Sequence, residues 1–179
     1  MENVFTLDRH EAFMSRAIEL AGKGQGNVSP NPMVGCVLVK DGEIIGEGFH
    51  EEFGGDHAEV IALNNARKDP IDSTVYITLE PCCISYKTPP CTDALIHNSI
   101  SEVFIGMLDP NPEINGKGKE ILEKAGIKVH VGTLGKEIEK INRPFSKWIT
   151  TGEPWVIAKV AQTPNGYMGI NSETSVWLT

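Results

Sequence analysis

The sequence has few basic residues and no long apolar run. Its 16 lysine and arginine residues are outnumbered by 24 aspartate and glutamate residues, which gives a formal net charge of −8. A broad nucleic-acid-binding surface is normally basic, so this balance argues against one. No apolar run approaches the roughly 18 residues that a membrane-spanning helix needs, and residues 1–4 do not open a secretory signal. We therefore expect a cytoplasmic protein with neither a nucleic-acid nor a membrane partner.

Cysteine is also scarce, with four residues in a chain of 179. Since no secretory signal is seen, we expect a reducing compartment, in which disulfides are rare. Cys36 lies within the apolar stretch 34–39 and is predicted to be a small core residue. Cys83 adjoins a candidate metal ligand, and we expect it to be a pocket-wall or core thiol rather than a ligand. The other two cysteines belong to a pattern with a specific chemistry.

The segment from His57 to Cys91 has the pattern of a catalytic zinc site. It contains His57-Ala58-Glu59, Glu80-Pro81-Cys82 and Pro90-Cys91. One imidazole and two thiolates provide three protein ligands for a tetrahedral zinc ion, and the fourth position is left for water. Zinc lowers the pKa of bound water from about 15.7 to roughly 7, and Glu59 can reach that water as a proton shuttle. The same layout is found in the zinc deaminases that act on nucleobases.

A structural zinc site is the alternative interpretation of this pattern. Structural sites usually have four protein ligands, and their cysteines typically come in two short CxxC pairs. Here Cys82 and Cys91 are separated by eight residues, and the sequence does not contain two CxxC pairs. The pattern therefore favours the catalytic interpretation.

Alternating helix and strand patterns predict a layered α/β domain whose sheet is largely parallel beyond its first hairpin. A chain of 179 residues that is 40% apolar is long enough for one domain of ordinary size. Asp8 with Glu11 resembles a capping box at a helix start, and Asp41-Gly42 predicts a type I′ hairpin turn. The predicted helices cover 8–21, 57–66, 91–97, 118–125 and 134–148, and the predicted strands cover 34–39, 44–48, 75–79, 103–107, 127–131 and 155–161.

These elements should bring the zinc ligands together. The strand at 75–79 would deliver Cys82 at its carboxyl end, while His57 and Cys91 would lie at the starts of two helices. In open α/β sheets, ligands collect at the carboxyl ends of the strands. We therefore expect two helix starts and one strand end to converge on the metal.

The last residues of the chain have a different character. Gly152-Glu153-Pro154 ends the last predicted helix of the domain, and a new strand is predicted at 155–161. A single strand cannot bury a core alone, so this piece should pack on the domain or on a partner, or begin a second domain. The expected division is a zinc-dependent deaminase domain at 1–150 and a C-terminal extension at 151–179.

Further motifs surround the zinc pattern, and they carry a family resemblance. The most specific are Ser29-Pro30-Asn31-Pro32, Asp109-Pro110-Asn111-Pro112 and the eight-residue spacing of the cysteines, whereas His-Ala-Glu alone is typical of cytidine deaminase-like proteins in general. With these motifs the chain resembles the N-terminal deaminase domain of the bifunctional riboflavin-biosynthesis deaminase/reductases over most of residues 8–150. The matching segments are 29–35, 48–50, 57–59, 78–82, 87–91, 109–112 and 116–118.

The resemblance implies a fold, a reaction and a set of site residues. The fold is a three-layer α/β/α, cytidine deaminase-like fold with a mixed sheet and helices on both faces. The reaction is hydrolytic deamination of 2,5-diamino-6-ribosylamino-4(3H)-pyrimidinone 5′-phosphate to 5-amino-6-(5-phosphoribosylamino)uracil and ammonia. By similarity, one zinc ion per chain would be held by His57, Cys82 and Cys91, with Glu59 as the proton shuttle. The side chains expected to line the substrate pocket are Asn31, His50, Lys87, Asp109 and Asn111.

Each pocket residue has an alternative interpretation. The two asparagines and Asp109 could be turn formers, and His50 and Lys87 could be exposed surface residues. The remaining histidines, His10, His97 and His130, lack motif context and are expected to be structural or exposed. A homo-oligomer is expected by analogy with the family.

The chain departs from the family between the two cysteines. The family usually has a histidine two residues after the first cysteine and a glycine before the lysine, where this chain has Ile84 and Tyr86. No metal ligand changes, but that histidine helps to bind substrate in the family. Two alternatives therefore stay open: a deaminase of another nucleobase or nucleotide, including a tRNA base, and a catalytically degenerate zinc-bound scaffold.

The C-terminal extension also resembles a part of the family. The stretch 155–161, the turn Thr163-Pro164-Asn165-Gly166 and the final Val176-Trp177-Leu178-Thr179 look like the opening of its NADPH-dependent reductase domain. The nucleotide-binding bulk of that domain is absent from the chain. We therefore expect neither an NADPH site nor reductase activity in this chain.

Overall fold

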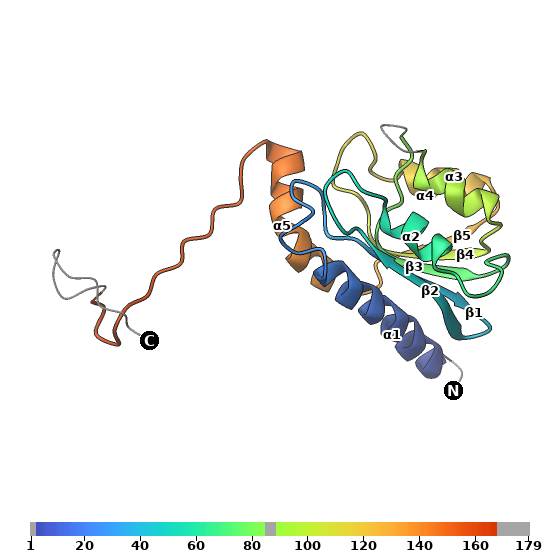
Figure 1. Ribbon diagram of the computed structural model, residues 1–179, viewed down its shortest axis with the longest axis horizontal. Coiled ribbons are helices and arrows are strands. Elements are labelled where there is room, and N and C mark those ends of the chain that lie inside the picture. The colour runs from blue at the N-terminus through green and yellow to red at the C-terminus, as the bar shows by residue number, and fades with distance from the viewer. Residues whose placement is uncertain (1–2, 85–88, 168–179) are drawn as a thin grey trace.

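A five-stranded sheet lies between two layers of helices (Figure 1). The computed structural model describes residues 3–84 and 89–167. In chain order the elements are α1 (Asn3–Gly22), β1 (Gly35–Lys40), β2 (Glu43–Phe49), α2 (Ala58–Asn64), β3 (Thr74–Leu79), α3 (Cys91–His97), β4 (Glu102–Met107), α4 (Lys117–Lys124), β5 (Lys128–Val131) and α5 (Gly135–Thr151).

The sheet is mixed, with strand order β2-β1-β3-β4-β5. β1 pairs antiparallel with both β2 and β3, whereas β3, β4 and β5 are parallel. The β1–β2 hairpin turns at Asp41 and Gly42, whose φ angles of 51° and 78° are those of the predicted type I′ turn. The predicted fold class, a three-layer α/β/α arrangement with a mixed sheet, is confirmed.

Two apolar clusters hold the layers together, one on each face of the sheet. β1 has apolar side chains on both of its faces because each face is covered by helices. The cluster under α2, α3 and α4 contains Cys36, Leu38, Ile45, Ala58, Ala62, Val75, Ile77, Leu95, Ile100, Val103, Ile105, Leu122 and Ile127. The cluster under α1 and α5 contains Met14, Ala17, Leu20, Val37, Val39, Tyr76, Phe104 and Ile138.

The predicted start of the first helix is wrong. The helix begins at Asn3, so the Asp8 and Glu11 pattern lies inside α1 and does not mark its start. An Asp-x-x-Glu spacing places two residues on one side of a helical turn wherever it occurs in a helix. The pattern alone therefore could not locate the first turn.

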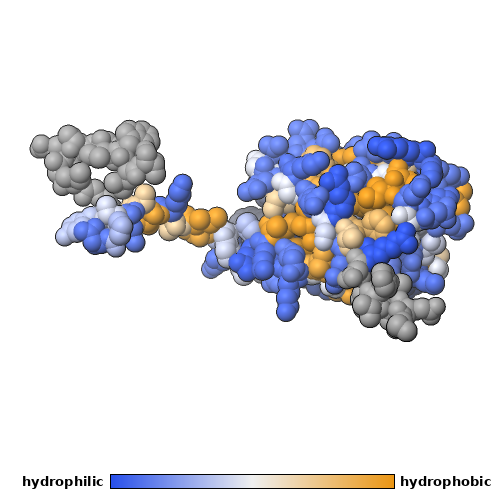
Figure 2. All heavy atoms as spheres, turned by 90° about the horizontal axis from the view of Figure 1, so that it is seen from below, coloured by the Kyte–Doolittle hydropathy of each residue, from blue (hydrophilic) through white to orange (hydrophobic). Residues whose placement is uncertain are grey.

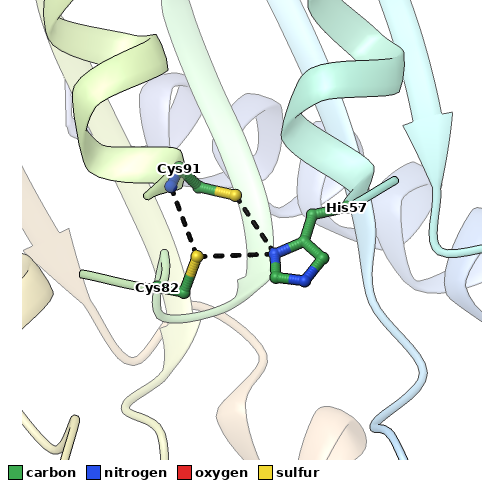
Figure 3. A group of neighbouring side chains, drawn as sticks. All are labelled: His57, Cys82 and Cys91. Atoms are coloured by element: carbon green, nitrogen blue, oxygen red, sulfur yellow. Dashed lines mark hydrogen bonds between the residues drawn. The ribbon is translucent and has the colours of Figure 1, made fainter. Parts of the chain in front are cut away.

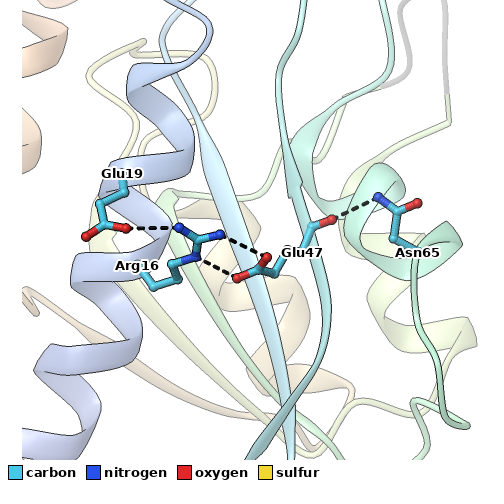
Figure 4. Close-up of polar contacts among 4 residues, drawn as sticks. All are labelled: Arg16, Glu19, Glu47 and Asn65. Atoms are coloured by element: carbon cyan, nitrogen blue, oxygen red, sulfur yellow. Dashed lines mark hydrogen bonds and ion pairs between the residues drawn. The ribbon is translucent and has the colours of Figure 1, made fainter.

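A polar network attaches α1 to the edge strand β2 (Figure 4). Arg16 donates to Glu47 through Nε at 2.7 Å and through Nη2 at 3.1 Å, and to Glu19 through Nη1 at 3.0 Å. On the other side of β2, Asn65 donates to the backbone carbonyl of Glu47 at 3.0 Å. Such a bond gives an edge-strand carbonyl a partner and so helps to protect the edge of the sheet.

Close packing of α2 on β2 depends on Gly48. A Cβ atom at this residue would lie 2.4 Å from the carbonyl oxygen of Ala58 and 2.5 Å from the amide nitrogen of Ala62. Both atoms belong to the backbone of α2, which cannot yield as a side chain would. The absence of a side chain at Gly48 therefore sets how closely α2 approaches the sheet.

We expect Gly48→Ala to push α2 away from the sheet and to lower the free energy of unfolding by about 1–3 kcal/mol, as overpacking does. Urea denaturation of the full chain measures this change. Gly22→Ala is the matched control, because a Cβ atom there meets nothing within 4 Å. Equal stability of the wild type and Gly48→Ala would contradict the packing argument.

The predicted strand at 155–161 is wrong. In its described part, residues 152–167, the extension runs away from the end of α5 without joining the sheet (Figure 1). Its apolar side chains are exposed, with Val156 at 80% and Ile157 at 78%, and orange spheres interrupted by blue ones mark this segment in Figure 2. Strand-forming residues need a neighbouring strand to pair with, and within the described residues none pairs with this segment. Residues 176–179 lie outside the described part of the chain.

None of the described helices could cross a membrane. Within residues 3–84 and 89–167, no helix combines the necessary length with the necessary hydrophobicity.

Candidate active site

The structure brings the side chains of His57, Cys82 and Cys91 together (Figure 3). The Nδ1 atom of His57 lies 3.2 Å from Sγ of Cys91 and 3.4 Å from Sγ of Cys82. All three donor atoms lie within 4.8 Å of one another. One nitrogen and two sulfur donors at this spacing fit a single zinc ion, because imidazole and thiolate are the ligands that zinc prefers.

Each of the three candidate metal ligands lies at or near the end of a helix or strand. His57 immediately precedes α2 in an extended conformation, Cys91 is the first residue of α3, and Cys82 follows the carboxyl end of β3. The backbone N–H of Cys91 donates to Sγ of Cys82 at 3.3 Å. The first N–H groups of a helix have no partner within the helix, so a thiolate can accept one of them. The predicted meeting of two helix starts and one strand end is confirmed.

The two sulfurs share negative charge unequally. Hydrogen bonds from the Cys91 side chain and from His57 lower the pKa of Cys82 to about 4. The hydrogen bond to Cys82 raises the pKa of Cys91, and the bond to Cys82 also raises the pKa of His57 to about 9. Two thiols this close cannot both ionise easily unless a cation lies beside them. The donor group is therefore electrostatically suited to a divalent ion.

Glu59 lies beside this group in the first turn of α2 and is only 3% exposed. Burial raises its pKa to about 7, and the negative charge of Cys82 acts in the same direction. The positive charge of His57 and a hydrogen bond with the Cys91 side chain act in the opposite direction. A buried carboxyl group is thus held next to the candidate metal ligands.

A cavity of about 370 Å³ opens onto these residues. Most of the predicted pocket residues face it, but Lys87 lies outside the described residues. Ile84, the departure from the family pattern, also contributes to the wall. Cys83 belongs neither to the described donor group nor to the described lining. The residues lining the cavity are Asn31, Pro32, Val34, His50, Phe53, Gly54, Gly55, His57, Ala58, Glu59, Leu79, Glu80, Cys82, Ile84, Asp109, Asn111, Ile114, Phe145 and Ile149.

His50 and Asn31 form a fixed pair in the cavity wall. His50 is buried, which excludes the interpretation of this side chain as solvated surface. Its Nδ1 atom lies 2.9 Å from the carbonyl oxygen of Asp56, and its Nε2 atom lies 3.0 Å from Nδ2 of Asn31. Because a carbonyl can only accept, the proton is on Nδ1, and Nε2 accepts from Asn31. The carbonyl oxygen of the Asn31 side chain is then left as an acceptor.

Asp109 and Asn111 form local turns and also face the cavity. Asp109 Oδ1 accepts the backbone N–H of Asn111 at 2.8 Å, and Asn111 Oδ1 accepts that of Glu113 at 3.0 Å. Burial raises the pKa of Asp109 to about 6. Their part in turns is therefore compatible with a place in the cavity wall, and their contact with substrate stays a prediction.

Sequence reasoning missed the contribution of α5. Phe145 and Ile149, both in α5, line the cavity. The buried Asn142 hydrogen-bonds α5 to the segment that follows Asn31. Its Oδ1 accepts the backbone N–H of Met33 at 2.8 Å, and its Nδ2 donates to the carbonyl of Met33 at 2.9 Å. The sequence did contain one signal of this contact. Asn142 is a polar residue on the helix face that otherwise carries Ile138, Phe145 and Ile149.

The remaining histidines have no described role at the cavity, as predicted. His10 lies against the sheet, 2.7 Å from the Tyr76 hydroxyl through Nδ1 and stacked on Phe104 at 4.2 Å. His97 and His130 are exposed, and His130 pairs with Glu102 at 2.9 Å.

The sequence is similar to a family of known proteins and to individual relatives within it. Residues 7–107 match the family described as "Cytidine and deoxycytidylate deaminase zinc-binding region". The chain is 50% identical over 142 residues to the diaminohydroxyphosphoribosylamino-pyrimidine deaminase of Buchnera aphidicola subsp. Schizaphis graminum, which covers 79% of this chain and 97% of that relative. It is 47% identical over 167 residues to riboflavin biosynthesis protein RibD of Actinobacillus pleuropneumoniae, which covers 93% of this chain and 44% of that relative.

A solved structure agrees with these relatives. The diaminohydroxyphosphoribosylaminopyrimidine deaminase/5-amino-6-(5-phosphoribosylamino)uracil reductase of Thermotoga maritima superposes with a TM-score of 0.86 at 48% identity, covering 89% of this chain and 46% of that one. The chain thus spans less than half the length of this two-activity protein and of the RibD relative.

Proposed function

Because the chain belongs to the cytidine and deoxycytidylate deaminase family and, within it, to the diaminohydroxyphosphoribosylaminopyrimidine deaminases, we propose that it deaminates 2,5-diamino-6-ribosylamino-4(3H)-pyrimidinone 5′-phosphate. The products are 5-amino-6-(5-phosphoribosylamino)uracil and ammonia. The observation that carries the proposal is one cavity whose wall contains the candidate metal-binding residues, a buried carboxyl group and a set of polar side chains. The reaction belongs to riboflavin biosynthesis, the process named for the RibD relatives.

In this proposal, His57, Cys82 and Cys91 hold one zinc ion per chain. When bound, zinc supplies Lewis-acid chemistry that makes water a nucleophile at neutral pH. Support for this ligand set comes from the spacing of the three donors and from the zinc-binding family that the chain matches. Three protein ligands, rather than four, are what a catalytic zinc site requires.

Glu59 moves the protons of the reaction. Hydrolysis adds the oxygen of water to the ring carbon that carries the amine, breaks the carbon–nitrogen bond and releases ammonia. Water must lose protons, and the ring nitrogen and the departing amine must gain them. A carboxylate beside the metal ligands can accept a proton and pass it on, which is general acid–base catalysis.

The polar residues of the cavity wall orient the substrate. The side-chain oxygen of Asn31, which makes no hydrogen bond to another described residue, can accept from an N–H group of the pyrimidinone. Asp109 and Asn111 offer further polar groups in the cavity wall. His50 fixes the orientation of Asn31. Lys87 would supply a positive charge for the ribose phosphate.

The chain is divided, in this proposal, into a deaminase domain at 1–150 and an extension at 151–179 that begins a further domain. The comparison supports this division, because relatives that match over 93% and 89% of this chain are about twice its length. The absence of an NADPH site from this chain stays a prediction. The cytoplasmic location and a homo-oligomeric assembly stay predictions.

An ammonia-release panel tests the proposed substrate. Zinc-loaded full chain is incubated with the diaminopyrimidine phosphate, cytidine, dCMP, guanine and adenine. We expect turnover of the diaminopyrimidine phosphate, with kcat/KM at least about 100-fold above that for any other compound, because a site built to bind polar groups rejects substrates that leave them unpaired.

Other outcomes would contradict the proposal. Preference for another member of the panel would assign the chain to a different nucleobase or nucleotide, with Ile84 in the cavity wall as the first residue to examine. Bound zinc with no turnover of any compound would indicate the degenerate scaffold.

A further inference from the structure

Glu80 is a buried acidic residue to which the mechanism above gives no part. It follows the last residue of β3 and is 3% exposed. Its side-chain oxygens accept three backbone N–H groups: Oε2 accepts from Asp109 at 3.1 Å and from Gly116 at 2.9 Å, and Oε1 accepts from Lys119 at 3.1 Å. A buried carboxyl group needs such partners to offset the loss of water.

The three N–H groups belong to the segment that carries one side of the cavity wall. Residues 109–119 lead from β4 into α4 and include the pocket residues Asp109, Asn111 and Ile114. Gly116 and Lys119 lie at the start of α4, where N–H groups have no partner within the helix and where a negative charge is favourable. No side chain of the helix start itself caps α4, so Glu80, the residue that follows β3, performs this task.

The start of α4 lies tightly against the end of β3. A Cβ atom at Gly118 would lie 2.3 Å from the carbonyl oxygen of Pro81 and 3.2 Å from Cγ of Glu80. The contact therefore allows the segment little freedom to shift toward β3.

Glu80 is also only two residues from a candidate metal ligand. The strand end that delivers Cys82 to the metal centre thus fixes, through Glu80, the segment that carries Asp109 and Asn111. Glu80 itself lines the cavity, but both of its oxygens are already engaged by backbone N–H groups, so its part is to hold this segment rather than to bind substrate.

We propose that Glu80 is a positioning residue, which sets the location of the Asp109–Asn111 side of the cavity relative to the metal centre and so controls substrate binding. The effect on substrate binding rests on the proposed function. The structural part, that Glu80 holds residues 109–119 in place, rests on the geometry alone. It predicts that loss of the carboxylate weakens substrate binding more than it slows the chemical step.

Glu80→Gln is the test variant, because it keeps the shape of the side chain but cannot accept all three bonds. In the ammonia-release assay we expect KM to rise at least 10-fold while kcat changes less than 3-fold, with zinc content equal to that of the wild type. Glu120→Gln is the matched control, since it removes the same charge from an exposed side chain on α4, the helix that Glu80 caps. This variant should change neither KM nor kcat. A Glu80→Gln enzyme with unchanged KM, or one that loses zinc and kcat together, would overturn the proposal.

Amide hydrogen exchange, resolved residue by residue by NMR in the absence of substrate, tests the structural part in the wild type itself. The N–H groups of Gly116 and Lys119 should exchange at least 10-fold more slowly than solvent-exposed first-turn amides, and this protection should be lost in Glu80→Gln while the sheet stays protected. Rapid exchange of both amides in the wild type would overturn the inference even if the variant did not fold. A wild-type chain that shows this protection but turns over no compound would count against the proposed function and leave the structural part intact.

Discussion

Cys82→Ala and Cys91→Ala are each expected to remove the metal and, with it, turnover. Each substitution leaves two of the three donors that the structure brings together. Loss of a residue that merely supports a metal ligand typically costs 10- to 100-fold in metal affinity, so loss of a ligand should cost more than about 100-fold. After dialysis against a weak chelator, elemental analysis should find about one zinc per chain in the wild type and almost none in either variant.

The adjacent cysteine provides the matched control. Cys83 is half-buried and lies outside the described donor group, so Cys83→Ala should keep both zinc and ammonia release. Full zinc occupancy in Cys82→Ala would refute the ligand assignment. Loss of zinc from Cys83→Ala would show that the site uses a different pair of sulfurs.

The elements that form the site could be predicted from the sequence because their signals are local. The apolar stretch that becomes β3 places Cys82 near a strand end, and Cys91 follows two prolines and opens the helical run that contains Ala94, Leu95 and Ile96. The parallel pairing of β3 with β4 then brings Asp109 to the same edge of the sheet. Convergence at one edge follows from these local signals once the sheet is known to be parallel there.

The parts of the site that could not be predicted depend on long-range contacts. Asn142 bonds the backbone of Met33 across 109 residues of sequence, and no pattern near either residue records that pairing. The same reason explains why Phe145 was missed as a cavity residue. The wrong prediction of a strand at 155–161 has a different cause. The local pattern of a strand is present there, but no described strand pairs with this segment.

Glu59→Gln is expected to keep the metal and to lose most of the activity. The substitution preserves the size of a side chain that is 3% exposed, but an amide cannot take a proton from water and return it to the leaving amine. General acid–base catalysis by one positioned group contributes about 10²- to 10⁴-fold, so kcat should fall by that factor while KM changes little. Zinc content should match the wild type, because Glu59 is not one of the three donors.

The control for this prediction is Glu51→Gln, which removes an exposed carboxylate from the loop before His57 and should leave kcat unchanged. Two results would contradict the role of Glu59, and they have different meanings. Zinc-loaded Glu59→Gln with undiminished ammonia release would transfer the proton shuttle to another group. Loss of zinc from the variant would make Glu59 a fourth ligand, and a site closed by four protein donors is the structural kind that leaves no position for water.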